Sequence, residues 1–167
     1  MLRNPARVFF LSSLLLCFLH LNWAAGELPD RVATHFGAGG RADGWADRSS
    51  FLLMYGLLVV GMSAILGGIG WFAGRLPVSW LNLPNRDHWF EPQRRAATEA
   101  RLRDQMLVMA GATNLFFLGL MHVTVQANRQ PEPQLGGGFW VLFAAYLAFV
   151  AGWSVRFTRG YRVTSPR

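Results

Sequence analysis

Charged side chains are scarce in this chain of 167 residues: only 15% are Asp, Glu, Lys or Arg. An ordinary soluble domain carries such side chains at about a quarter of its positions. The few charges lie in clusters between long apolar runs, and 52% of all residues are hydrophobic. This distribution excludes a typical soluble globular domain and indicates a protein whose solvent is lipid.

Lysine is absent, so all 16 basic residues are arginine. Codon bias in a GC-rich genome would produce this usage, and we attach no chemistry to it. A net charge of +7 would suit a nucleic-acid partner, but the arginines flank apolar segments, where they anchor helices at anionic headgroups. Cysteine occurs once, at Cys17, which excludes a disulfide framework and a cysteine-based metal site. We therefore expect the lipid bilayer, and not nucleic acid, as a partner.

Four apolar runs dominate the chain, and each has the length needed to cross about 30 Å of hydrocarbon as a helix. Helices are expected because the backbone has no water to bond with inside a bilayer. The sequence thus predicts an all-α membrane protein, a single domain of residues 1–167 folded as a four-transmembrane-helix bundle. The predicted spans are residues 8–25, 51–73, 106–127 and 139–157, with an outer loop at 26–50 and a cytoplasmic loop at 74–105.

The first span has a second interpretation as a signal peptide. It starts with basic residues, has an apolar middle, and Ala24-Ala25-Gly26 resembles a cleavage region. We favour an uncleaved first helix.

Arginine counts predict the orientation of the bundle. Two arginines precede the first span, six lie in loop 74–105 and four follow from Arg156 onward, whereas the other two loops carry three and one. Because arginine is enriched in cytoplasmic segments, we expect both termini and loop 74–105 in the cytoplasm. In the cytoplasmic loop, residues 91–106 read as a helix that runs into the third span, with Pro92 in its first turn.

Small residues recur at helical spacing in the second and fourth spans, where they would permit close approach between helices. They are Ala64, Gly68, Gly70 and Gly74 in the second span and Ala144, Ala148 and Gly152 in the fourth. We expect these faces to pack within the bundle. Docking onto another membrane protein is the alternative.

Polar residues inside the predicted spans are few. Asn114 lies near the middle of the third span and needs a partner in another helix, where it would hold the bundle together by about 1 kcal/mol. His20, His35 and His122 fall at a similar depth on the predicted outer side, and three imidazoles could hold zinc, copper or haem iron. No His-x-x-x-His spacing is present, so we prefer hydrogen-bonded structural histidines to a metal site.

The outer loop contains a short extended stretch, residues 32–36, followed by GAGG and by Asp43-Gly44, which supply turns. A compact, hairpin-like cap over the outer face of the bundle is therefore expected.

The segment LPDRVATHFGAGGRADGW resembles the signature of the bacterial "domain of unknown function 1648" membrane family, which also contains the SdpI-type toxin-immunity proteins. The matching positions are Pro29, His35, Phe36, Gly40, Asp43, Gly44 and Trp45. In that family the motif follows the first transmembrane helix, as it does here, and residues 81–95 are similar to a second segment of its short members. The resemblance implies a location in the inner membrane of a bacterium and an immunity or signalling role, although this sequence shows no appended second bundle like those of the immunity proteins.

Catalytic chemistry has little support in the sequence. The serines inside the spans have no plausible histidine and carboxylate partners, so we expect a protein that is not an enzyme and uses no cofactor. The leading hypothesis is a small membrane protein that senses a ligand, or acts like an immunity protein, through its outer loop. The alternatives are an accessory subunit of a larger membrane complex and a metal or haem protein that uses the outer histidines.

Overall fold

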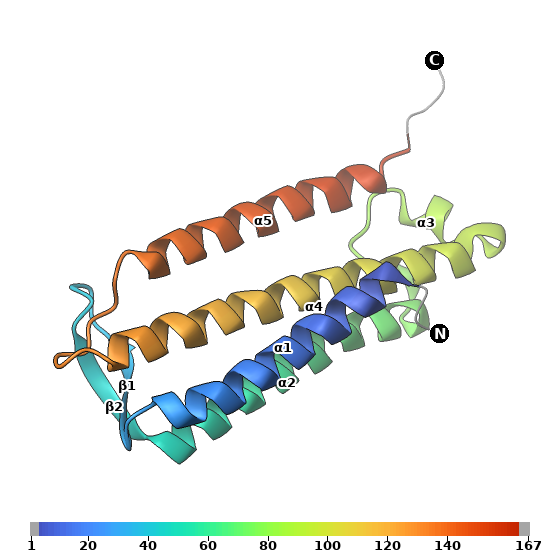
Figure 1. Cartoon of the computed structure of the whole chain (residues 1–167). Coiled ribbons are helices and arrows are strands. Elements are labelled where there is room, and N and C mark those ends of the chain that lie inside the picture. Colours follow the sequence, from blue (N-terminus) through green and yellow to red (C-terminus); the bar gives the residue numbers. More distant parts are fainter. Residues whose placement is uncertain (1–3, 164–167) are drawn as a thin grey trace.

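The computed structural model describes residues 4–163 and contains four long helices (Figure 1). Arg3 and Arg167, two of the arginines counted for the orientation, lie outside the described residues. By length and composition, all four helices could cross a membrane. The prediction of a helical, multi-pass membrane protein is confirmed. The helices are α1 (Pro5–Glu27), α2 (Arg48–Phe72), α4 (Pro92–Asn128) and α5 (Gly138–Gly160).

Short elements connect the long helices. A β-hairpin of β1 (Arg31–Phe36) and β2 (Ala42–Asp47) joins α1 to α2. Two 3-10 turns, η1 (Ala73–Arg75) and η2 (Val78–Trp80), and the short helix α3 (Arg86–Trp89) join α2 to α4. Helix α4 starts well before the predicted third span, as the helical pattern of residues 91–106 indicated.

Two of the long helices begin at side-chain caps. The Asn4 side chain accepts hydrogen bonds from the backbone N–H groups of Ala6 and Arg7, and a proline follows it at the first helical position. At the start of α2, the Asp47 carboxylate accepts from the hydroxyl of Ser49 and from the backbone N–H of Ser50. These hydrogen bonds lower the pKa of Asp47 to about 2, because they favour its charged form. Each cap satisfies N–H groups that the helix itself leaves unpaired.

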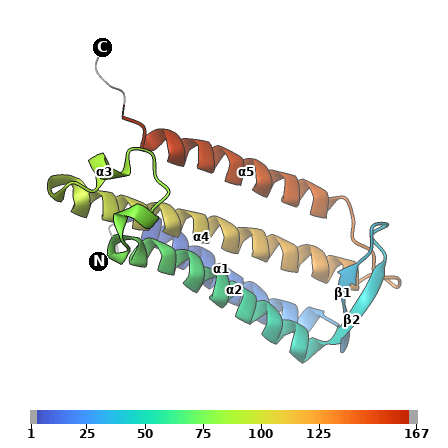
Figure 2. The same ribbon diagram turned by 180° about the vertical axis from the view of Figure 1, so that it is seen from behind.

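Helix α4 is the axis of the bundle. Helices α1 and α2 pack along one side of it and α5 lies on the other, as both views show (Figures 1 and 2). The first and last described residues lie at the same end of the bundle, as an even number of spans requires. We call this the arginine end, because it gathers most of the arginines of the chain, and we call the opposite end the hairpin end.

Glycines set the close approaches to α4, and some of them differ from the ones the sequence pointed to. A Cβ on Gly70 would come within 2.8 Å of the Met106 Cβ, and one on Gly74 would clash with the Glu99 side chain. Gly111, in α4 itself, faces the ring of Phe9, which a Cβ would meet at 2.6 Å. The expected packing within the bundle therefore holds for Gly70 and Gly74.

The other small residues face outward. Ala64, Ala144, Ala148 and Gly152 are exposed. Gly68 is half-buried, and a Cβ there would meet the ring of Phe72, in the same helix, at 3.9 Å. No residue of α5 is buried. For these positions, the prediction that they pack within the bundle is wrong, because the faces they occupy are directed away from α4 or into an open groove.

A buried amide ties three helices together at the centre of the bundle. Asn114 is fully buried, accepts a hydrogen bond from the Ser63 hydroxyl of α2 at 2.9 Å, and donates one to the Ser13 hydroxyl of α1 at 3.3 Å. Its backbone carbonyl also accepts from the Cys17 thiol. The interhelical partner expected for Asn114 is thus present in both neighbouring helices.

Replacing Asn114 by alanine should lower the free energy of unfolding by about 1–2 kcal/mol, because two buried hydroxyls lose their shared partner and a cavity is left behind. Unfolding of the detergent-solubilised chain, followed by circular dichroism, measures the change. Asn22→Ala is the matched control, since Asn22 is exposed on α1. Equal stabilities of the two variants would contradict the role assigned to Asn114.

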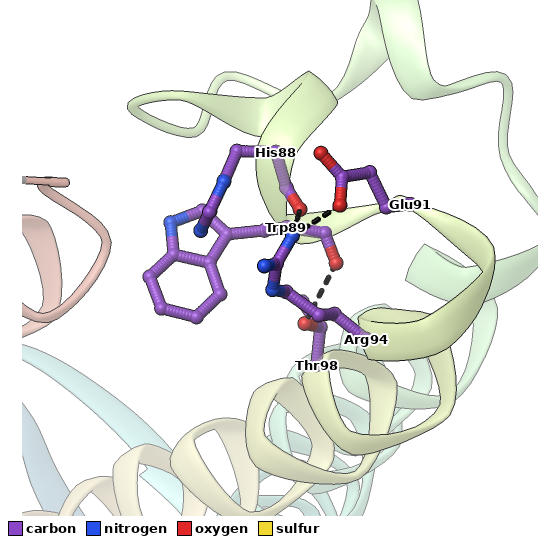
Figure 3. A network of polar contacts seen from close by, with 5 residues as sticks. All are labelled: His88, Trp89, Glu91, Arg94 and Thr98. Atoms are coloured by element: carbon purple, nitrogen blue, oxygen red, sulfur yellow. Dashed lines mark hydrogen bonds and ion pairs between the residues drawn. The ribbon is translucent and has the colours of Figure 1, made fainter.

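At the arginine end, the segment before α4 folds back onto its first turns (Figure 3). The Thr98 hydroxyl donates to the backbone carbonyl of Trp89 at 2.9 Å, and Arg94 pairs with Glu91. The Trp89 indole N–H donates to the carbonyl of Tyr161, just past α5, at 2.8 Å. Through these contacts, the segment between α2 and α4 is held against both α4 and the end of α5.

Candidate functional site

The residues of the family-like motif form the antiparallel hairpin β1–β2 at the hairpin end of the bundle. The chain reverses over residues 37–41, where the N–H of Gly40 donates to the carbonyl of Gly37 at 2.8 Å. Gly40 has a φ of +76°, and a Cβ there would meet the Leu135 carbonyl oxygen at 2.8 Å. Only glycine fits this position without strain. The expected hairpin-like cap is therefore present.

Asp43-Gly44 does not form a turn, which corrects the sequence prediction. Both residues lie inside β2, and Gly44 pairs with His35 at a point where the strand register shifts. A Cβ on Gly44 would approach the His35 Cβ to 2.8 Å. The glycine is thus needed for close approach of the two strands, one of the two common roles of glycine inside a strand.

The polar motif residues are displayed on the outside of the hairpin. His35 and Asp43 form an ion pair whose side chains are 75% and 53% exposed. The ring of Trp45 lies beneath the Arg31 guanidinium, 5.5 Å from the ring centroid. Pro29, also exposed, precedes β1. Because solvent screens such pairs, they contribute little to stability, which leaves His35 and Asp43 available for binding.

Helix α4 holds the hairpin through a single amide. The Asn128 side chain accepts from the backbone N–H of Ala33 at 2.7 Å and donates to the carbonyl of the same residue at 3.0 Å. This is the bonding pattern of a neighbouring strand, supplied by a side chain. Val32 and Ala33 are both fully buried, so β1 is fixed to the end of α4 by packing and by hydrogen bonds.

The connection between α4 and α5 completes the cap. The N–H of Leu135 donates to the Gly40 carbonyl at 2.8 Å, and the N–H of Ala42 donates to the Pro133 carbonyl at 3.3 Å. Arg41 and Gln134 form an isolated antiparallel bridge. Residues 133–135 thus lie alongside the hairpin turn and couple it to the start of α5.

A pocket of 460 Å³ lies under this turn. The hairpin supplies His35 and Phe36 to its wall, α4 supplies Thr124, and the start of α5 supplies Phe139 and Trp140. The lining is aromatic and apolar with a few hydroxyl and imidazole groups, a composition typical of sites for small or amphipathic ligands. We call it the hairpin pocket.

The structure brings together two of the three histidines that the sequence placed at a similar depth. His20 Nε2 lies 3.3 Å from His122 Nδ1, and the Trp23 ring packs against both imidazoles. Arg129 lies over the Trp23 ring at 5.5 Å. His35 does not join them, because the hairpin carries it outward to pair with Asp43. Within residues 4–163, no group of three or more His, Cys, Asp or Glu side chains is arranged to hold a metal ion. The candidate metal site of three histidines is therefore wrong.

Residues 13–59 match a known family, described as Domain of unknown function (DUF1648). This segment of the chain is therefore similar to that family. The match runs from the middle of α1 through the whole hairpin into α2, so the DUF1648 segment is a helix–hairpin–helix unit. No curated protein and no solved structure matches the chain.

The DUF1648 segment does not complete the site by itself. Asn114, which bonds its two helices, and Asn128, which holds its hairpin, both come from α4, outside the matched residues. The role of Asn114 could be predicted from the sequence, because an amide in the middle of an apolar span is unusual. The role of Asn128 could not, because an amide at the end of a helix is an ordinary feature.

Asn128→Asp should loosen the hairpin, because a carboxylate still accepts from the Ala33 N–H but cannot donate to its carbonyl. Hydrogen–deuterium exchange of residues 31–36 should rise several-fold in this variant, while exchange in the middle of α4 stays unchanged. Gln126→Ala, which removes an exposed amide from the same helix, is the control. Unchanged protection of β1 in Asn128→Asp would show that packing alone holds the hairpin.

Proposed function

We propose that this DUF1648 protein is a binding protein of the bacterial cytoplasmic membrane, without enzymatic activity, that recognises an apolar or amphipathic ligand at its hairpin end. An immunity-like role, in which the ligand is a membrane-active peptide, is the form of this function we favour. The observation that carries the proposal is the hairpin pocket, which lies directly beneath the residues of the DUF1648 motif.

The chemistry of the pocket supports a ligand with both apolar and polar parts. Phe36, Phe139 and Trp140 offer aromatic surface, and Thr124 offers a hydroxyl. The exposed His35 lines this pocket and contacts Asp43, and this pair would receive a polar or charged group. An apolar residue of a peptide in the pocket, with a charged neighbour at this pair, fits this arrangement.

The arginine distribution supports an orientation with the hairpin outside the cell. Arginines concentrate at the end of the bundle where α1 begins and α5 ends, and that end is expected in the cytoplasm. The hairpin pocket would then meet a ligand that arrives from outside, before the ligand crosses the membrane.

The test compares growth of cells with and without the chain in the presence of a panel of membrane-active peptides. We expect protection against at least one peptide and its loss in Trp140→Ala, because the loss of one aromatic wall weakens binding by about tenfold. Trp80→Ala is the matched control: it removes an exposed tryptophan near the arginine end.

Equal protection by the two tryptophan variants would overturn the role of the hairpin pocket. Failure of every peptide would remove the immunity-like form of the proposal. Immunoblotting of membranes establishes that each variant is inserted to the same level, so that a loss of protection reports on binding and not on abundance.

A second candidate function is that of an accessory subunit in a larger membrane complex. It is favoured by the outward small-residue face of α2, where Ala64 and Gly68 line an apolar groove of 480 Å³ with Trp71 and Phe72. A partner helix could approach this face closely, because its small side chains leave room for another backbone.

Native gel migration after mild detergent extraction tests the subunit function. A complex larger than one chain with its micelle is expected, and Ala64→Leu should reduce it, whereas Ala151→Leu on the exposed face of α5 should not. A species no larger than the monomer in its micelle would remove the subunit candidate and leave the ligand-binding proposal in place.

A further inference from the structure

Helix α5 touches α4 firmly in its first half. The Tyr146 ring stacks on the ring of Phe116 with centroids 4.2 Å apart, and its hydroxyl lies 2.9 Å from the Thr113 hydroxyl. Because Gly119 of α4 has no Cβ, the Leu142 side chain of α5 can lie close to it. A Cβ on Gly119 would come within 2.8 Å of that side chain. This contact fixes the half of α5 nearest the hairpin.

A second attachment holds the other end of α5. Arg101 Nη1 donates to the Gly160 carbonyl at 3.0 Å, and the buried Tyr161 donates its hydroxyl to Gln105 at 2.9 Å. Burial raises the pKa of Tyr161, partly offset by the neighbouring Arg101. Helix α5 is thus tied to α4 at two places along its length.

Between these attachments a groove of 960 Å³ lies between α4 and α5. Its apolar walls come from small and aromatic side chains of both helices. On α5 these are Ala148, Phe149, Gly152, Trp153 and Phe157, and on α4 they are Ala97, Ala100 and Val108. A groove of this size inside a bilayer has to be filled, and the walls accept hydrocarbon.

The charged residues of the groove lie towards the arginine end. Arg101 and Arg156 line it, and neither forms an ion pair with any carboxylate of residues 4–163. The Arg101 guanidinium lies over the Tyr161 ring, 4.7 Å from its centroid, and so is held in place. Asp104 is the one carboxylate in the lining, and it accepts a hydrogen bond from the Asn4 amide at 2.8 Å.

We propose that this groove is a binding site for one anionic phospholipid. Its phosphate lies between Arg101 and Arg156, which supply charge-assisted hydrogen bonds. An acyl chain follows the α5 wall from Arg156 past Gly152 to Ala148, a distance of about 12 Å along the helix. That length suits a hydrocarbon chain that starts at the headgroup and ends near mid-membrane.

The charge of the groove favours a lipid over a second copy of this chain as its occupant. A second copy docked symmetrically through this groove would bring its own Arg101 and Arg156 to the same depth, where the like charges repel. Two arginines and one carboxylate, Asp104, give the lining a formal charge of +1, which the single negative charge of a phosphodiester balances. The lipid would also act as a filler that keeps α5 at its distance from α4 between the two attachments.

Native mass spectrometry of the full chain, released from nanodiscs of phosphatidylcholine with a minor fraction of phosphatidylglycerol, tests this site. We expect the wild type to retain one phosphatidylglycerol in preference to phosphatidylcholine. Arg156→Gln should lower that retention about tenfold, since a hydrogen bond to a charged group is lost. Arg159→Gln, which removes a neighbouring arginine outside the groove, should leave it within about twofold.

A steric variant keeps the test independent of charge. Gly152→Leu fills the groove, and nothing lies within 4 Å of a Cβ there, so the helix accepts the residue. It should abolish retention of phosphatidylglycerol, whereas Gly61→Leu, at an equally open position on α2, should not. Equal retention of the two lipids by the wild type would overturn the proposal. So would unchanged retention in Arg156→Gln and Gly152→Leu, or a dimeric mass that Gly152→Leu abolishes.

Discussion

The amide of Asn114 is the interaction on which the rest of the bundle depends. In lipid, an unpaired amide is costly and no water can replace a missing partner, so α1 and α2 must present Ser13 and Ser63 to it. This requirement fixes the rotation of both helices about α4. Apolar packing alone would permit several rotations, because lipid is as apolar as the side chains it replaces.

The same constraint positions the hairpin at the end of α4. Asn128 lies fourteen residues after Asn114, about 21 Å further along α4 and on nearly the same face. Once Asn114 has oriented α1 and α2 on that face, the hairpin between them reaches the end of α4 where Asn128 can bond both backbone groups of Ala33. The DUF1648 helix–hairpin–helix unit is therefore completed by a helix outside the matched segment.

Helix α5 stands apart from this system. It has no buried residue, and it meets α4 through an aromatic stack at one end and through Arg101 and Tyr161 at the other. Its position makes one wall of the hairpin pocket and one wall of the α4–α5 groove. A ligand or lipid that shifts α5 at one of these sites would therefore change the shape of the other site.

The sequence predicted the features that depend on local pattern. Long apolar runs predicted the four helices, a mid-span amide predicted the role of Asn114, and glycine-rich turns predicted a hairpin. Features that depend on three-dimensional placement were not predictable. His20, His35 and His122 were predicted to lie at equal depth, but His35 does not meet the other two, because the hairpin directs it outward. Similarly, the stripe of Ala148 and Gly152 gave no sign of whether it faces a helix or a groove.

A double-mutant cycle on Ser63 and Asn114 tests whether the central amide holds α2 to α4. The free energy of unfolding in detergent would be measured for the wild type, Ser63→Ala, Asn114→Ala and the double variant. A coupling of about 0.5–1.5 kcal/mol between the two substitutions is predicted, in the range of hydrogen bonds between membrane helices. Strict additivity of the two single effects would contradict the account, because it would mean that the central amide does not hold α2 to α4.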